Sequence, residues 1–337
     1  MKKITLNSPF DMHLHLRDGD MLNLVAPLTS KTFAGAIVMP NLVPPVDSKE
    51  SVLEYKNRIL QAIDEKDNFT PFMTLFFKPY TRAFLEDVKD EISAIKLYPA
   101  GITTNSEGGV QTIDTKALAP TLNAMADLDI PLCVHGETNG FVMDREQEFM
   151  SVYEALATAF PKLTIIMEHI TTKDAVEMLD KYDNLYATIT LHHLLITLDD
   201  VAGGMLQPHL FCKPIAKKPI DREALLDVAL NGHPKVMFGS DSAPHPKEAK
   251  ESCGCAAGVF TAPIAIQVLV NLFDTHGKLD NLQKFLSDNA CEIYNMAPSS
   301  KQITLVNENF QVPASYDFKK EKVVPMYAQE ILSWKIL

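Results

Sequence analysis

Short apolar runs of strand length recur along this chain, and segments with helical periodicity separate them. Eight such runs lie at residues 10–16, 34–40, 72–77, 92–98, 130–136, 163–170, 185–191 and 235–241. Nearly continuous Ile, Val, Leu and Phe are typical of strands buried on both faces, and alternation with helices indicates a parallel sheet. Eight strand–helix repeats predict an α/β fold of the TIM-like (β/α)8 barrel type, with an open doubly wound sheet as the alternative.

Two segments fall outside this repeat. Residues 101–112 are polar and glycine-rich and follow the fourth predicted strand, so they suit either a mobile lid or an ordinary surface loop. Near the end of the chain, residues 301–306 have the pattern of a further strand within a tail of irregular pattern. We expect one domain over residues 1–337, with the barrel at about 10–290 and a C-terminal extension at 291–337.

The composition is that of an ordinary globular protein. Of the 337 residues, 46% are hydrophobic and 22% are charged, close to the average for folded domains. The net charge of -12 disfavours binding to nucleic acid or to an anionic membrane, because both carry negative charge. A small anionic substrate is still compatible with this charge, since a metal or an arginine can reverse the sign inside a pocket.

Features related to targeting and redox state are few. The chain starts with Met-Lys-Lys, but no apolar run follows, so we expect no signal peptide and a cytoplasmic location. No apolar stretch approaches the roughly 20 residues of a membrane-spanning helix. The five cysteines are odd in number and irregular in spacing, which favours reduced thiols over a disulfide framework.

Two histidines lie in the first predicted strand. Side chains alternate along a strand, so we expect His13 and His15 on one face. Met12, Leu14 and Leu16 should then fill the other face. Neutral imidazole is a common zinc ligand, and two at this spacing can hold one ion. Such a pair can equally be buried against carbonyl groups, so the motif alone leaves both interpretations open.

Four more polar side chains occur late in other predicted strands. They are Lys96 in the fourth strand, His135 in the fifth, His169 in the sixth and Asp241 in the eighth. The working residues of such barrels lie at the C-terminal ends of the strands. Each of these residues has a plain structural explanation by itself, but the shared placement of all six predicts a metal site.

Several segments together resemble one enzyme family. They are Asp11–Asp20, Met39–Asn41, Ile95–Ala100, Val134–Glu137, Glu168–Thr172 and Ser240–His245. In this order they are similar to the motifs of dihydroorotases of the amidohydrolase superfamily, in particular the shorter, monofunctional bacterial type. The resemblance spans roughly residues 10–265, which is nearly the whole predicted barrel.

The resemblance implies two zinc ions per subunit. It implies one ion bound by His13, His15 and Asp241, and a second bound by His135 and His169. Lys96 would bridge both ions as an N6-carboxylysine, because a protonated ammonium cannot bind a cation. Burial favours the neutral amine, which can add carbon dioxide and become an anionic carboxylate.

The resemblance also implies a set of substrate-binding residues. They are His15, Arg17, Asn41, Thr103, Thr104, His135, Lys213, His245 and Ala257. Arg17, Asn41 and His245 would bind a substrate carboxylate through charged or amide donors. The two threonines belong to the predicted lid, where their hydroxyl groups could bond the same carboxylate and exclude water.

Two residues of this set would bind through their backbone. Lys213 and Ala257 would use backbone groups, although Lys213 is charged where the family usually has an aliphatic residue. Ala256 is an alternative to Ala257, because the register there is uncertain by one residue. His192 and His193 follow directly on the seventh predicted run, and adjacent side chains of a strand face opposite ways. We therefore expect them to pack or to support the residues of the site, and not to chelate a metal together.

The implied reaction is the reversible cyclisation of N-carbamoyl-L-aspartate to (S)-dihydroorotate plus water, a step of de novo pyrimidine biosynthesis. Asp241 would be the catalytic residue that moves a proton between water and the amide nitrogen. The resemblance further implies a homodimer. A hydantoinase or allantoinase would share the metal ligands but not necessarily the substrate-binding residues. A non-catalytic scaffold barrel would typically have lost ligands that this chain keeps.

Overall fold

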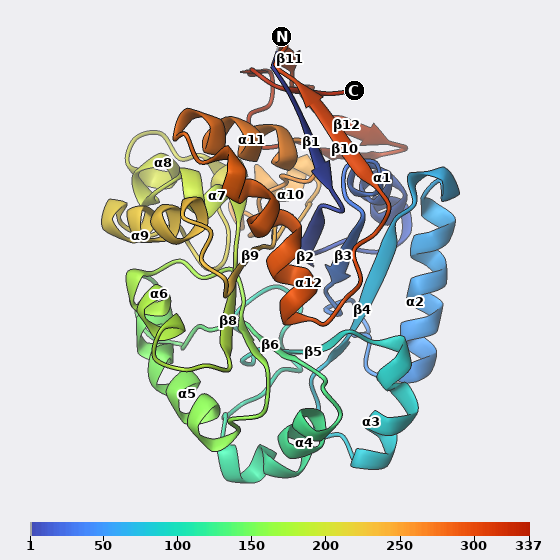
Figure 1. Cartoon of the computed structure of the whole chain (residues 1–337), viewed down its shortest axis with the longest axis vertical. Coiled ribbons are helices and arrows are strands. Elements are labelled where there is room, and N and C mark those ends of the chain that lie inside the picture. Colours follow the sequence, from blue (N-terminus) through green and yellow to red (C-terminus); the bar gives the residue numbers. More distant parts are fainter. Residues whose placement is uncertain (1) are drawn as a thin grey trace.

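The computed structural model describes residues 2–337, and its centre is a barrel of eight parallel strands (Figure 1). The strands are adjacent in chain order, namely β2 (Phe10–Leu14), β3 (Gly35–Val38), β4 (Thr70–Phe76), β5 (Ala94–Leu97), β6 (Leu132–Val134), β7 (Ile165–Met167), β8 (Leu185–Ile189) and β9 (Val236–Phe238). Each strand overlaps one of the eight predicted apolar runs. The prediction of a (β/α)8 barrel is therefore confirmed.

Helices surround the strands and cover the outside of the barrel (Figure 1). The longer ones are α1 (Gly19–Ser30), α2 (Lys49–Ala62), α3 (Arg82–Val88), α4 (Thr115–Asp127), α5 (Arg145–Ala159), α6 (Lys173–Leu179), α9 (Pro219–Leu230) and α11 (Ala265–Thr275). Shorter helices are α7 (Leu191–Leu195), α8 (Leu198–Ala202), α10 (Lys247–Lys250) and α12 (Asn289–Ile293). Local signals start several of them; the Ser48 hydroxyl, for example, accepts a hydrogen bond from the Ser51 amide before α2.

Apolar side chains form two buried clusters that correspond to the two sides of the barrel wall. In the outer cluster, strand residues such as Ile95 and Val134 pack with the helices. The inner cluster contains Ala94 and Cys133 from the same strands. This division follows from the alternation of side chains along each strand. Lys96 comes two residues after Ala94, so it too points into the barrel, nearer the C-terminal end of β5.

Strand β2 departs from simple alternation. Its register against β3 shifts between Asp11 and Leu14, as in a β-bulge. Met12 consequently belongs to the inner apolar cluster, whereas Leu14 and Leu16 belong to the outer one. The prediction that these three residues share one face was wrong for Met12, because the irregular pairing interrupts the period of two.

The barrel closes between β2 and β9 through backbone groups at their C-terminal ends. The amide of Asp241 donates to the carbonyl of His13 at 2.8 Å, and the amide of His15 donates to the carbonyl of Ser242 at 3.2 Å. These bonds join the first and last strands of the barrel. The closure therefore brings the two histidines of the first strand next to Asp241.

Strands from both ends of the chain form a small sheet outside the barrel. In it β1 (Lys3–Asn7) pairs with β10 (Gln302–Val306), and β10 pairs with β15 (Lys335–Ile336). Two further pairs are β11 (Phe310–Gln311) with β14 (Ile331–Leu332) and β12 (Tyr316–Phe318) with β13 (Glu321–Val323). Strand β10 confirms the strand predicted at residues 301–306, and Figure 1 shows it beside β1 near the two termini.

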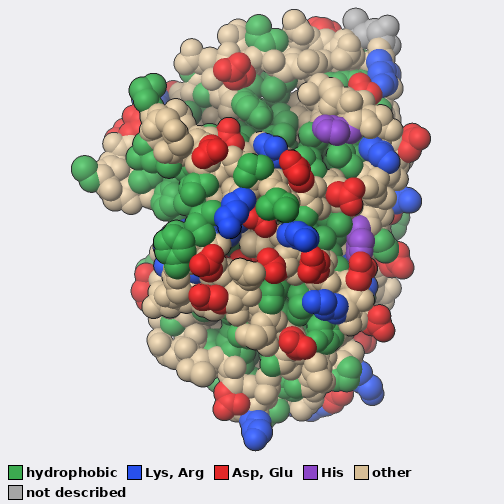
Figure 2. Space-filling model, turned by 90° about the vertical axis from the view of Figure 1, so that its left-hand side faces the viewer, with side chains coloured by type: hydrophobic (Ala, Val, Ile, Leu, Met, Phe, Trp, Pro, Cys, Tyr) green, Lys and Arg blue, Asp and Glu red, His purple; other side chains and the backbone are tan. Residues whose placement is uncertain are grey.

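The outer surface carries charges of both signs. Figure 2 shows Lys and Arg side chains interspersed with Asp and Glu on the left-hand side of the molecule as drawn in Figure 1. A small lobe with apolar side chains at its tip projects from this view. Within residues 2–337, no helix has both the length and the apolar character needed to cross a membrane.

Replacing Asp11 by alanine is expected to weaken the closure of the barrel. The buried Asp11 carboxylate accepts hydrogen bonds from the Ser240 amide and hydroxyl at 2.7 and 2.5 Å and from the His13 amide at 3.2 Å. Unpaired buried donors cost about 1–3 kcal/mol each, so we expect the free energy of unfolding in urea to fall by about 3 kcal/mol or more.

The control for this variant is Asp183→Ala, which removes an exposed carboxylate. Its free energy of unfolding should change by less than about 0.5 kcal/mol. Equal stability of the Asp11→Ala protein and the wild type would show that these hydrogen bonds do not hold the barrel closed.

Candidate active site

The six predicted metal ligands lie together at the C-terminal end of the barrel. They are His13, His15, Lys96, His135, His169 and Asp241, and each is at most 7% exposed. His13 and Lys96 belong to strands, whereas the others follow the ends of β2, β6, β7 and β9 within three residues. Buried ionisable groups need partners or a metal, so this gathering is itself chemically informative.

The first group of ligands consists of His13, His15 and Asp241. The Asp241 Oδ1 atom lies 3.0 Å from His15 Nε2 and 3.4 Å from His13 Nε2. One potential ligand atom from each residue lies within 4.8 Å of the others. Two imidazole nitrogens and a carboxylate oxygen are a suitable set for zinc or a similar divalent ion.

The second group consists of His135 and His169. Their Nδ1 and Nε2 atoms, respectively, face each other at 3.2 Å. Two nitrogen ligands of one tetrahedral zinc lie about 3.3 Å apart, so this spacing suits a shared ion. The ring centroids of His169 and His13 are 4.9 Å apart, which places the second group directly beside the first.

Lys96 is buried within the barrel close to both groups. Its side chain is 0% exposed, and its Nζ atom has no hydrogen-bond partner among the described residues. Burial lowers the pKa of Lys96, and the charges of Glu168, Cys133 and Asp241 oppose this effect only in part. An unpaired buried amine of this kind fits modification to a carboxylate that ligates metal. The residues present therefore fit a centre for two metal ions.

Two carboxylates outside the ligand set orient the imidazoles. Glu168 Oε2 lies 2.8 Å from His13 Nδ1, and Glu137 Oε2 lies 2.8 Å from His135 Nε2. These contacts leave His13 Nε2 and His135 Nδ1 directed toward the centre. Carboxylates in this position fix the tautomer and the ring orientation of metal-binding histidines.

Sequence reasoning did not assign a role to these two glutamates. Glu168 directly precedes His169, and Glu137 follows His135 by two residues. A carboxylate close to each of these histidines in the sequence could have indicated a hydrogen-bond partner for the imidazole. Glu168 nevertheless bonds the histidine of β2 and not its own neighbour, so its partner was not evident from the spacing.

Hydrogen bonds determine the charge of Asp241. Burial alone would raise the pKa of this carboxyl, but hydrogen bonds with His13 and His15 outweigh that effect and hold the pKa well below 3.8. Burial lowers the pKa of His15 to about 4. At neutral pH the carboxylate is therefore ionised beside a neutral imidazole, which is the form in which both groups bind metals.

Several of these residues occupy strained backbone conformations. The φ angles of Arg17, His169 and Asp241 are 58°, 42° and 43°, in the left-handed region that non-glycine residues rarely adopt. Each residue follows the end of a barrel strand. Strain of this kind persists where the surrounding structure holds side chains in position for function.

Most of the predicted substrate-binding residues line one small cavity beside Asp241. They are His15, Arg17, Asn41, Thr103, Thr104, Lys213 and Ala257. Ala257 lines this cavity and Ala256 does not. His245 lies at the edge, where its Nε2 atom accepts a hydrogen bond from Arg17 Nη2 at 3.0 Å. His135 lies apart from the lining, within the second group of ligands.

The loop at residues 101–112 covers this cavity. Asn41 Nδ2 donates to the Thr104 carbonyl at 3.0 Å, and Asn105 Nδ2 donates back to the Asn41 carbonyl at 3.0 Å. Lys213 Nζ donates to the Ile102 carbonyl at 3.1 Å. The cavity of about 20 Å³ has room for about one water molecule. We therefore expect the loop to move when a substrate with a six-membered ring binds in this cavity.

Comparisons with known proteins agree with this geometry. A sequence profile of the amidohydrolase family matches residues 9–302. Dihydroorotase from Helicobacter acinonychis is 43% identical over 99% of this chain and 98% of its own length. The crystal structure of dihydroorotase from Campylobacter jejuni is 58% identical, with a TM-score of 0.96 over 99% of this chain and 97% of that chain.

The chain belongs to the dihydroorotases of the amidohydrolase family. A more distant dihydroorotase, from Saccharomyces cerevisiae in complex with 5-fluoroorotic acid, is 33% identical with a TM-score of 0.94 over 100% of this chain and 99% of that chain. The family and the enzyme class predicted from the motifs are therefore confirmed. Dihydroorotases of this family depend on metal, and the two groups of ligands described above form the candidate site.

A second prediction about this dihydroorotase chain, besides that for Met12, was wrong. His192 and His193 are not the end of a strand but lie in the short helix α7, whose first turn is capped by Thr190. Both side chains are buried, and their ring centroids are only 4.4 Å apart. Adjacent residues on a helix are separated by about 100° and not 180°, so these two side chains can face the same neighbour.

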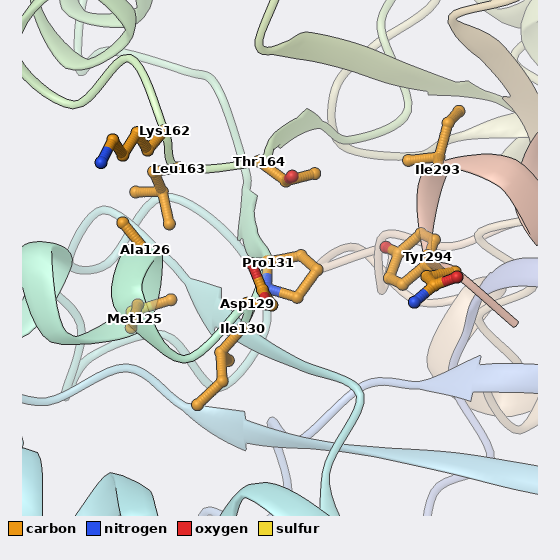
Figure 3. Close-up of a pocket in the computed structure, with 11 residues that line it drawn as sticks. Met125, Ala126, Asp129, Ile130, Pro131, Lys162, Leu163, Thr164, Ile293 and Tyr294 are labelled. Atoms are coloured by element: carbon orange, nitrogen blue, oxygen red, sulfur yellow. The ribbon is translucent and has the colours of Figure 1, made fainter.

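The barrel of this dihydroorotase also has a cavity at its opposite end. Figure 3 shows its lining residues, which precede β6 and β7 or lie at the C-terminal end of α12 and directly after it. The cavity measures about 260 Å³ and contains none of the predicted site residues. In such barrels the N-terminal end of the strands serves stability, so this cavity is separate from the candidate active site.

Replacing Lys213 by methionine is expected to loosen the loop over the dihydroorotase cavity. The change removes the Lys213–Ile102 hydrogen bond but keeps an unbranched side chain of similar length. One such bond is worth about 0.5–1.5 kcal/mol, so amide hydrogen exchange at residues 101–106 should accelerate by about 2–10-fold in the substrate-free protein.

Lys181→Met, at an exposed lysine elsewhere, is the control and should leave exchange in this loop unchanged. Unaltered protection of residues 101–106 in Lys213→Met would mean that the two asparagine bonds alone hold the loop in place.

Proposed function

We propose that this chain catalyses the reversible cyclisation of N-carbamoyl-L-aspartate to (S)-dihydroorotate plus water, using two Zn²⁺ ions per subunit. The chain would act on this small substrate in pyrimidine biosynthesis in the cytoplasm. The observation that carries the proposal of a two-metal centre is the unpartnered Lys96 amine, buried between two groups of ligands. Similarity to dihydroorotases over nearly the full chain supports the choice of substrate.

In this proposal His13, His15 and Asp241 hold one ion, and His135 and His169 hold the other. Lys96, with a carboxyl group on its amine, would be a ligand of both ions. When bound, the two ions polarise the substrate carbonyl and lower the pKa of the attacking water. The carboxylates of Glu168 and Glu137 keep the imidazoles in the required tautomers.

Asp241 moves the proton in this mechanism. Its carboxylate is ionised at neutral pH and faces the small cavity. During ring opening it accepts the proton of the attacking water and then delivers it to the departing amide nitrogen. During ring closure the same carboxylate takes the proton from the nitrogen and returns it to the departing water. The same residue therefore serves the reaction in both directions.

The remaining cavity residues bind and orient the substrate. Arg17 presents a guanidinium whose Nε donates to the Pro244 carbonyl at 3.1 Å and whose Nη2 donates to His245. These two contacts hold the guanidinium plane still, so its free edge can receive a carboxylate. Asn41 and the hydroxyl groups of Thr103 and Thr104 would bond the same carboxylate.

Backbone groups and the loop complete the substrate site in this proposal. Lys213 and Ala257 line the cavity, and in this proposal their backbone groups bind the substrate, which leaves their side chains free for other contacts. Closure of residues 101–112 excludes water from the reacting centre. The proposal also includes a homodimer, which follows from the resemblance alone; sedimentation of the purified protein would test it.

Replacing Lys96 by alanine is expected to lower metal content and turnover together, because the anionic bridge between the ions is lost. Metal per chain and hydrolysis of dihydroorotate are measured on the same preparation after gentle purification. The native mass of the wild type should exceed that of the chain and its metals by one carbon dioxide, and the variant should lack this increment.

The control for Lys96 is Lys235→Ala, which removes a lysine that donates to the Leu179 and Tyr182 carbonyls at 2.8 Å. It should keep the metals and the added mass. Retention of both ions and normal turnover by Lys96→Ala would refute the bridging role. Turnover of hydantoin or allantoin in preference to dihydroorotate would refute the substrate assignment independently of the metal result.

Replacing Arg17 by methionine is expected to weaken substrate binding and leave metal content unchanged. Loss of a positioned charged donor commonly costs about 10²-fold, here in kcat/KM for dihydroorotate. Arg17→Lys should recover only part of this loss, because an ammonium lacks the planar fork. The control is Arg58→Met, which removes a guanidinium bonded to Asp18 at the surface. Loss of metal in Arg17→Met would place Arg17 in the metal centre instead.

A further inference from the structure

A second cluster of potential metal ligands lies outside the candidate active site. It consists of His192 and His193 in α7 and of Cys212 in the segment that follows residues 208–210. One ligand atom from each residue lies within 4.8 Å of the others. All three side chains are at most 2% exposed. Two imidazoles and a thiol are a typical donor set for zinc.

His192 has no ordinary structural explanation among the residues described. Neither of its ring nitrogens has a hydrogen-bond partner, although both are buried. A neutral imidazole carries one donor and one acceptor, and each costs about 1–3 kcal/mol when buried unpaired. An unsatisfied buried group of this kind indicates a missing partner such as an ion.

The spacing around Cys212 agrees with a common centre. Its Sγ atom lies 3.6 Å from His193 Nε2, close to the separation of about 3.6 Å between sulfur and nitrogen ligands of tetrahedral zinc. The carbonyl oxygen of Pro214 lies 3.0 Å from the same nitrogen and 3.2 Å from the same sulfur. This oxygen is therefore in position to be a fourth ligand.

Hydrogen bonds alone account for only part of the cluster. His193 can donate from Nε2 to the Pro214 carbonyl while its Nδ1 accepts from the Thr190 hydroxyl at 2.9 Å. Cys212 can donate to the same carbonyl. This arrangement satisfies both residues but leaves His192 without any partner, so a metal-free cluster does not explain all three side chains.

We propose that His192, His193 and Cys212 form a structural site for a zinc ion, distinct from the catalytic pair, with the Pro214 carbonyl as fourth ligand. On binding, the Cys212 thiol releases its proton to solvent and the thiolate bonds the ion. The proton of His193 moves from Nε2 to Nδ1, from which it is donated to the Thr190 hydroxyl. No oxidation or reduction takes place.

The proposed site has a consequence for the neighbouring substrate cavity. It fastens α7 to the segment that contains Lys213, a residue that lines that cavity. Its ligands are closed off from solvent, as in structural zinc sites, so the ion is expected to bind while the chain folds. A chelator added to the folded protein should therefore remove this ion slowly.

Cobalt provides a direct probe, because a thiolate bound to Co²⁺ gives a charge-transfer band in the near ultraviolet. None of the six proposed catalytic ligands contains sulfur, so the band reports a cysteine site only. The full-length protein is produced in cobalt-supplemented medium. We expect the wild type to show the band and Cys212→Ser to lose it together with one metal ion per chain. The paired replacement of Cys253 and Cys255 by serine, outside the cluster, should retain both.

His192→Gln provides a second variant in case Cys212→Ser does not fold. It keeps the thiol but removes one imidazole, so one metal ion per chain should be lost or the band should shift. A wild type without the band and with the same metal count as the folded variants would overturn the proposal. A band that persists in Cys212→Ser and disappears in the Cys253 and Cys255 variant would also overturn it, because the thiolate site would then lie elsewhere.

Discussion

The candidate site depends on the closure of the barrel between β2 and β9. Two backbone hydrogen bonds join these strands, and they involve His13, His15 and Asp241 themselves. Residues from the first and last strands can share one metal ion only if the sheet closes at this point. A (β/α)8 barrel supplies such a closure and directs polar residues at the strand ends toward one opening. The backbone groups that close the barrel therefore also position the side chains of the candidate site.

Compensation of buried charge explains how the centre is stable inside an apolar barrel. His13 is paired with Glu168, and His135 with Glu137, so most ionisable groups have a partner within hydrogen-bond distance. Lys96 is the exception, and its lowered pKa follows from burial. Burial thus favours the neutral amine at this position, which is the form that can add carbon dioxide.

The side chain of Lys213 helps to hold the loop over the cavity. Because the proposed contact of residue 213 with substrate is made by its backbone, the side chain can vary. In this chain Lys213 donates to the Ile102 carbonyl and adds a third hydrogen bond to the two made through Asn41. The balance between these bonds and substrate binding sets how readily the loop opens.

By itself, the sequence predicted the eight strands, the barrel and the position of six polar residues at the strand ends, because hydrophobic period and position along a strand are local properties. The tertiary structure alone decided which groups meet. Glu168 bonds a histidine of another strand, Met12 turns inward at a bulge, and His192 and His193 share a helical turn with Cys212 nearby. Such pairings depend on distances between segments remote in the chain, and the periodicity of side chains carries no information about those distances.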